Sequence, residues 1–146
     1  MLDGAIEIAI RAHFGQVDKA GEPYILHPFR VMLSQEGEAA RVVGVLHDAV
    51  EDSELSLDDL AFEYEFPHEI VEAVDSVTRR EGEDYFEYVA RAKANPIGRK
   101  VKVADLNDNM DPKRRPASDP NCAERMAKYD RALCFLLDKT IVKDAA

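Results

Sequence analysis

Residues 42–52 read VVGVLHDAVED, an apolar run that contains a histidine and an aspartate side by side. Its apolar positions Val42, Val45, Leu46 and Ala49 recur at the three- and four-residue spacing of one helix face. The same spacing continues along most of the chain, without the sustained alternation that marks half-buried strands. We therefore predict an all-α fold, a compact multi-helix bundle.

Proline and capping residues divide this helical pattern into segments. Pro28 and Pro67 each suit the first turn of a helix, and Ser56 with Asp59 has the spacing of a capping box. Residues 111–120, rich in proline and charge, are expected to form a mobile loop that could act as a lid. Helices are predicted near residues 3–14, 28–36, 38–52, 57–66, 67–79, 84–94, 97–110 and 121–139.

The size and composition favour one domain over residues 1–146. The chain has 146 residues, of which 46% are hydrophobic and 33% charged, as in ordinary globular proteins. Its acidic, helix-patterned start and its lack of a long apolar run indicate a cytoplasmic protein. Cys122 and Cys134 fall in one helical segment, too far apart to bridge, and are predicted to be core thiols in a reducing compartment.

The charge balance limits the partners. With 29 acidic and 19 basic residues, the net charge of -10 disfavours nucleic acid and anionic membrane surfaces. A small anionic ligand is still possible, because local basic residues and a bound cation can make one cleft positive. A homo-oligomer is also possible. The candidate bases are Arg79, Arg80, Arg99, Lys100, Lys102, Lys113, Arg114 and Arg115, most of which are expected to be solvated.

Polar residues in apolar surroundings indicate a site. His47 and Asp48 interrupt the run at 42–52, and an unpaired charge there would be costly to bury. Glu51 and Asp52 follow one helical turn later, which predicts that one helix presents all four side chains to one region.

Two further segments contribute to the same prediction. Asp105 follows apolar residues in KVKVADLNDNM, with Asn109 one turn further on, and His27 lies between two prolines in PYILHP. Two histidines and two aspartates on three elements could form a mixed nitrogen and oxygen site for Mn²⁺, Fe²⁺, Zn²⁺ or Mg²⁺.

Five sequence segments, taken together and in order, are specific for one protein family, whereas a single His-Asp pair is not. The segments are AHFGQVDKAGEPYILHP, VLHDAVEDS, VTRR, KVKVADLNDN and ERMAKYDRAL, spread from about Ala5 to Leu137. In this order the chain resembles the HD-domain phosphohydrolases, and within them the hydrolase domain of the RelA/SpoT alarmone enzymes and the small alarmone hydrolases.

The resemblance implies roles for ten residues. It implies that the metal, usually Mn²⁺ in that family, is held by His27, His47, Asp48 and Asp105. It implies that Glu51 and Asp52 orient and activate the attacking water. Of the two, we expect Glu51 to take or steer the water proton, because the base must lie near the metal without being a ligand, and Asp52 to orient the water or a neighbouring cationic group. The nucleotide site would then be lined by Lys19, Asn109, Arg125 and Tyr129.

One position departs from the family pattern. Asp18 precedes Lys19 where the alarmone hydrolases carry an arginine that packs on the guanine base. A carboxylate cannot make that cation–π stack and repels phosphate, so the choice of base is in question. The chain is also expected to lack a synthetase domain, which leaves hydrolysis alone.

The sequence leaves three candidate functions open. The first is a guanosine 3′,5′-bis(diphosphate) 3′-pyrophosphohydrolase, favoured by the motif set. The second is an HD phosphohydrolase for another nucleotide or cofactor phosphate, favoured by Asp18. The third is a metal-stabilised binding module without catalysis, against which the presence of Glu51 and Asp52 argues.

Overall fold

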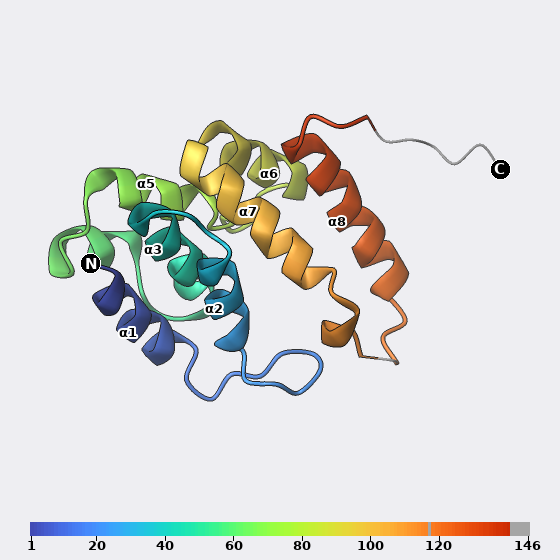
Figure 1. The fold of residues 1–146 in the computed structure, drawn as a ribbon, viewed down its shortest axis with the longest axis horizontal. Helices are drawn as coiled ribbons and strands as arrows, with labels where there is room; N and C mark the ends of the chain where they lie inside the picture. Colours follow the sequence, from blue (N-terminus) through green and yellow to red (C-terminus); the bar gives the residue numbers. More distant parts are fainter. Residues whose placement is uncertain (117, 141–146) are drawn as a thin grey trace.

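The computed structural model describes residues 1–116 and 118–140, and helices dominate this part of the chain (Figure 1). The α-helices are α1 (Leu2–Ala12), α2 (Leu26–Leu33), α3 (Glu38–Leu46), α4 (Ala49–Asp52), α5 (His68–Ser76), α6 (Tyr85–Ala94), α7 (Pro96–Asn109) and α8 (Cys122–Leu136). A π-helical turn, η1 (Asp59–Glu63), and a 3-10 turn, η2 (Pro112–Arg114), complete them. The predicted all-α fold is confirmed. None of the described helices is long and apolar enough to cross a membrane.

Helix α7 is the element that the other helices share. It contacts α2, α3, α5, α6 and α8, and Figure 1 shows it crossing the middle of the molecule between α2 and α8. The main apolar core surrounds α3, whose Val42, Val43, Val45 and Leu46 are fully buried. A second cluster, Val89, Leu106, Ala132 and Leu136, joins α6 and α7 to α8. Side chains on different faces of α7 therefore enter two separate apolar clusters.

Two glycines allow helices to approach closely. A Cβ atom on Gly44 of α3 would lie 3.1 Å from the Cα atom of Met32 on α2. A Cβ atom on Gly98 of α7 would lie only 2.0 Å from the hydroxyl of Ser76 on α5. A side chain at Gly44 would push the backbone of Met32 by a few tenths of an ångström, and one at Gly98 would displace the Ser76 side chain, so both glycines allow close packing of these helices.

Capping residues fix where several helices begin. The Asp84 carboxylate accepts hydrogen bonds from two backbone amides at the start of α6. Asn95 does the same for α7, with Pro96 in the first turn. Ser56 and Asp59 exchange the two hydrogen bonds of the predicted capping box. That box opens a helical segment over residues 57–63 that includes the π-helical turn η1, so the helix predicted over 57–66 is present and ends three residues early.

The helix predicted over residues 38–52 is wrong at its most informative point. Helix α3 ends at Leu46, and α4 begins at Ala49 after a break at His47 and Asp48. The Nδ1 atom of His47 lies 2.7 Å from the Gly44 carbonyl oxygen, which an uninterrupted helix would use for the amide of Asp48. The histidine side chain thus takes the place of a backbone donor where the helix stops.

The two cysteines also differ from expectation. Cys122 and Cys134 are free thiols of α8, and both are half-exposed. Because α8 packs against α6 and α7 at the edge of the bundle, these positions lie outside the core clusters. The prediction of core thiols is therefore wrong.

Candidate metal centre and adjoining hollow

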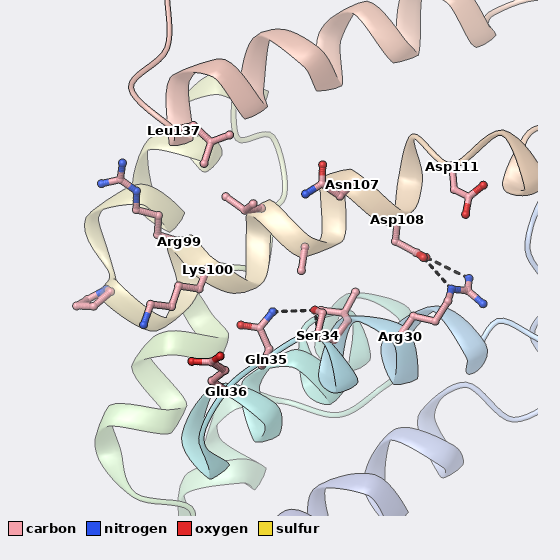
Figure 2. A pocket seen from close by; sticks show the side chains of 14 residues that line it. Arg30, Ser34, Gln35, Glu36, Arg99, Lys100, Asn107, Asp108, Asp111 and Leu137 are labelled. Atoms are coloured by element: carbon pink, nitrogen blue, oxygen red, sulfur yellow. Dashed lines mark hydrogen bonds and ion pairs between the residues drawn. The ribbon is translucent and has the colours of Figure 1, made fainter.

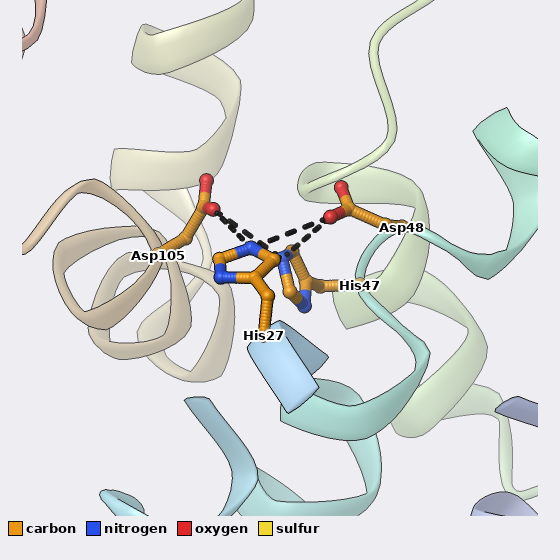
Figure 3. Close-up of side chains that lie close together, drawn as sticks. All are labelled: His27, His47, Asp48 and Asp105. Carbon is orange, nitrogen blue, oxygen red and sulfur yellow. Dashed lines mark hydrogen bonds and ion pairs between the residues drawn. The ribbon is translucent and has the colours of Figure 1, made fainter. Parts of the chain in front are cut away.

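Four polar side chains meet where α2, the break between α3 and α4, and α7 come together. His27, His47, Asp48 and Asp105 each place one ligand atom within 4.8 Å of the others, and Figure 3 shows the four converging. Both histidines and Asp105 are at most 4% exposed, while Asp48 is half-buried. The structure thus brings together the four residues that the sequence singled out as metal ligands.

The spacing within this cluster suits one divalent ion. The Nε2 atom of His27 lies 3.0 Å from Asp105 Oδ1 and 3.1 Å from His47 Nε2. His47 Nε2 lies 3.0 Å from Asp48 Oδ2. Donor atoms at about 2.1 Å from a shared metal lie about 3 Å apart when they subtend a right angle. The mixed nitrogen and oxygen set fits a divalent metal ion.

Hydrogen bonds on the outer side orient both imidazoles. His47 donates from Nδ1 to the carbonyl oxygen of Gly44, which only accepts. His27 Nδ1 lies 2.6 Å from a carboxylate oxygen of Asp108. With the proton on Nδ1 in each ring, the Nε2 lone pair faces the cluster, as a metal ligand requires.

Asp108 is a site residue that the sequence reasoning missed. Arg30 holds its carboxylate with two hydrogen bonds of 2.7 and 3.1 Å (Figure 2), and Arg114 Nη1 lies 3.2 Å from it. The signal was its position three residues after Asp105, on an adjacent face of the same helix. Arg30 and Asp108 also line the end of a hollow of about 830 Å³ between α2 and α7, which does not contain the four-residue cluster.

Charges within the cluster offset the cost of burial. Burial lowers the pKa of His27, but its hydrogen bonds to Asp105, Asp108 and Asp48 outweigh that effect and raise the pKa to about 9. Burial raises the pKa of Asp48, yet the neighbouring imidazoles hold it well below its usual range. A metal ion therefore has to compete with protons for the two imidazoles.

One of the candidate bases named from the sequence, Lys102, is buried beside this cluster. Lys102 is 6% exposed, and its Nζ atom lies 2.7 Å from Asp105 Oδ2 and 3.1 Å from the Tyr88 hydroxyl. Burial raises the pKa of Asp105, but Lys102 and the two histidines hold it well below its usual range. Asp105 thus offers one oxygen to the cluster while the other is tied to an ammonium group.

Glu51 and Asp52 lie near the cluster but reach different elements. Glu51 accepts a hydrogen bond from the backbone amide of Arg79, after the end of α5. Asp52 accepts one of 3.0 Å from the side chain of Gln16, in the segment after α1. The prediction that one continuous helix presents them with His47 and Asp48 is wrong, because α3 ends at Leu46 and α4 begins at Ala49.

The four residues expected to bind a nucleotide line one hollow. This hollow of about 340 Å³ is bounded by Val17, Asp18, Lys19, Tyr24, Asn109, Arg114, Arg115, Arg125 and Tyr129. Asn109 donates a 3.0 Å hydrogen bond to Asp105, and the Tyr24 hydroxyl donates one of 2.6 Å to Asp48. Two residues that line the hollow are thus hydrogen-bonded directly to residues of the metal cluster.

Asp18 lines this hollow and has structural partners. Its Oδ1 atom accepts hydrogen bonds from the backbone amides of Ala20 and Glu22, which fixes the turn around Gly21. Its Oδ2 atom lies 3.6 Å from Nε of Arg114, on the opposite segment after α7. The carboxylate therefore reaches the hollow partly neutralised by an arginine.

Known proteins resemble both the sequence and the fold. A guanosine-3′,5′-bis(diphosphate) 3′-pyrophosphohydrolase of Borreliella burgdorferi is 39% identical over 79 residues, which are 51% of this chain and 12% of that protein. A GTP pyrophosphokinase of Streptomyces coelicolor is 37% identical over 111 residues, 73% of this chain and 12% of that protein. The chain thus spans about an eighth of the length of these relatives. No protein-family model matches the chain.

A solved structure confirms the architecture. It is a metazoan ortholog of SpoT, described as hydrolysing ppGpp, with a TM-score of 0.71 and 19% sequence identity. The match covers 93% of this chain and 84% of that one. The chain therefore has the all-α fold of that protein, and the resemblance to the RelA/SpoT enzymes that the motifs indicated is confirmed.

We expect one divalent ion per chain, because the ligand atoms converge on a single point. Asp48→Asn and Asp105→Ala should each weaken binding at least tenfold, as removal of a charged ligand would. Metal titration by calorimetry, with circular dichroism to verify folding, measures this. Unchanged affinity in a folded Asp105→Ala protein would remove Asp105 from the site.

Asp108→Ala should weaken metal binding by about 10- to 100-fold, because His27 loses the carboxylate that orients its ring. Asp111→Ala is the matched control. This substitution removes one negative charge three residues from Asp108, and the Asp111 side chain caps the turn η2. The dissociation constants of the two variants are compared at one pH. Equal affinities would show that the contact between Asp108 and His27 does not support the metal.

Proposed function

We propose that the chain is a metal-dependent guanosine 3′,5′-bis(diphosphate) 3′-pyrophosphohydrolase. One observation carries the proposal: the four-residue cluster adjoins a hollow whose walls include Lys19, Asn109, Arg125 and Tyr129. A metal-ligand set beside a pocket with several cationic side chains suits hydrolysis of a phosphate bond. The relatives' names support the alarmone as substrate.

The ligands His27, His47, Asp48 and Asp105 would hold the ion, for which we propose Mn²⁺. When bound, such an ion lowers the pKa of water and stabilises negative charge on a phosphoryl oxygen. Lys19 and Arg125 would neutralise the phosphate groups of the nucleotide, while Asn109 and Tyr129 would position it.

Glu51 is the proposed proton acceptor. Partial burial and the nearby Asp48 carboxylate raise its pKa, the direction that suits a general base. Its Oε1 atom accepts the amide of Arg79, so the other oxygen is available to a water molecule. Asp52, held by Gln16, would orient this water or a cation beside it.

The same proposal includes the wider expectations from the sequence. Residues 1–146 would form a single domain of HD type, acting on a small nucleotide in the cytoplasm. The net charge of -10 supports a small ligand in a local cationic hollow over a nucleic acid. The second candidate, a phosphohydrolase for another nucleotide, is supported by Asp18 in the wall of the hollow.

A substrate screen tests the proposal. Mn²⁺-loaded protein is incubated with the alarmone and with nucleotides that lack the 3′-diphosphate, and phosphate and pyrophosphate are quantified separately. Release of pyrophosphate from the alarmone alone is expected. Turnover of other nucleotides instead would favour the second candidate, and no turnover at all would favour a binding module.

Glu51→Gln should bind the metal nearly normally and lose about 100- to 10,000-fold in kcat, because it keeps the acceptor for the Arg79 amide but removes the basic oxygen. Parallel metal titrations and steady-state kinetics separate the two effects. Near-wild-type kcat in the variant would end the assignment of Glu51 as the base.

Asp18→Asn should raise kcat/KM for the alarmone several-fold, because it keeps the turn-forming acceptor while removing a negative charge that occupies Arg114. The ratio of kcat/KM for the alarmone to that for a non-guanine nucleotide shows whether the change concerns phosphate or base. A gain for both substrates assigns Asp18 to phosphate repulsion. No change for either would place Asp18 outside the substrate contacts.

A further inference from the structure

Lys128 lies in the middle of α8, beside residues already assigned to the hollow. Its Nζ atom lies 4.3 Å from the ring centroid of Tyr85 and 5.5 Å from that of Tyr129. Together with Asn121, Glu124 and Arg125 it lines a small hollow of about 250 Å³. Arg125 also lines the larger hollow of about 340 Å³, so the two hollows share a wall.

Two of the cations near Lys128 have carboxylate partners, and in the described part of the chain Lys128 has none. Arg125 forms an ion pair with Asp119, and Lys102 forms one with Asp105. Among residues 1–116 and 118–140, no carboxylate lies within ion-pair distance of Lys128. A half-buried ammonium group held over an aromatic ring, without a carboxylate partner, leaves its charge available to a ligand.

The surrounding charges also favour an anion at this place. Burial lowers the pKa of Lys128, and repulsion from Arg79, Lys102, Arg125 and Lys19 lowers it further. Two of those cations, Lys19 and Arg125, line the hollow of about 340 Å³, and a third, Lys102, is bonded to Asp105 of the metal cluster. A phosphate group placed among them would relieve this repulsion, in a chain whose net charge is otherwise strongly negative.

We propose that Lys128 binds a diphosphate group of the substrate, together with Arg125 and Lys19, and so selects substrates that carry a diphosphate. This inference rests on the proposed function and extends it to Lys128, which lies within the segment ERMAKYDRAL but is not among the ten residues with an assigned role. The cation–π contact with Tyr85 holds the ammonium group in place before the ligand arrives, which reduces the entropy lost on binding.

The test is the affinity of the metal-loaded protein for inorganic pyrophosphate, measured by calorimetry. Lys128→Gln should weaken binding about tenfold, the size expected for one charge-assisted hydrogen bond. Lys128→Arg should keep most of the affinity. Lys100→Gln is the matched control, because Lys100 is an exposed lysine of the other hollow and its loss changes the net charge equally.

Kinetics provide an independent readout. With the alarmone as substrate, Lys128→Gln should raise KM more than it lowers kcat, as removal of a binding contact does. Wild-type affinity for pyrophosphate in Lys128→Gln would overturn the inference, and so would a loss equal to that of Lys100→Gln.

The two proposals fail in different ways. If wild-type protein releases no pyrophosphate from the alarmone but Lys128→Gln still weakens pyrophosphate binding, the proposed function is wrong and the diphosphate site stands. If the alarmone is hydrolysed and Lys128→Gln binds pyrophosphate normally, the function stands and the role of Lys128 is wrong.

Discussion

The structure depends on the burial of two imidazoles and two carboxylates at one point of an apolar bundle. Such groups are costly to remove from water unless each has a partner. When protonated at Nε2, His27 and His47 pair with the carboxylates of Asp105 and Asp48, and Lys102 compensates the second oxygen of Asp105. The break after Leu46 follows from the same constraint, because His47 bonds the carbonyl of Gly44 as it turns toward the cluster.

Helix α7 connects this cluster to its surroundings. Asp105 enters the cluster, Asn109 one turn later bonds to Asp105 and lines the hollow, and Asp108 orients His27 from outside. Because these three residues lie on one rigid helix, helix geometry fixes their relative positions. The close contact at Gly98 keeps that helix against α5.

The distribution of charge reconciles an acidic chain with an anionic ligand. The excess of carboxylates lies elsewhere, whereas the wall of the hollow gathers Lys19, Arg114, Arg115 and Arg125 around one aspartate, Asp18. Local potential in a cleft depends on the groups that line it, and net charge describes only the field at a distance. Two of these arginines come from the segment after α7 that the sequence identified as a loop.

The sequence by itself determined the helical class, most helix positions and the four residues of the cluster. Periodicity and capping act over a few residues, and a histidine or aspartate in an apolar run stands out without knowledge of its partners. Only the tertiary structure decided that Asp108 touches His27, that Arg114 approaches Asp18 and that Lys128 lies over the ring of Tyr85. These contacts join residues far apart in the chain, and they arise from how helices pack, which local spacing does not encode.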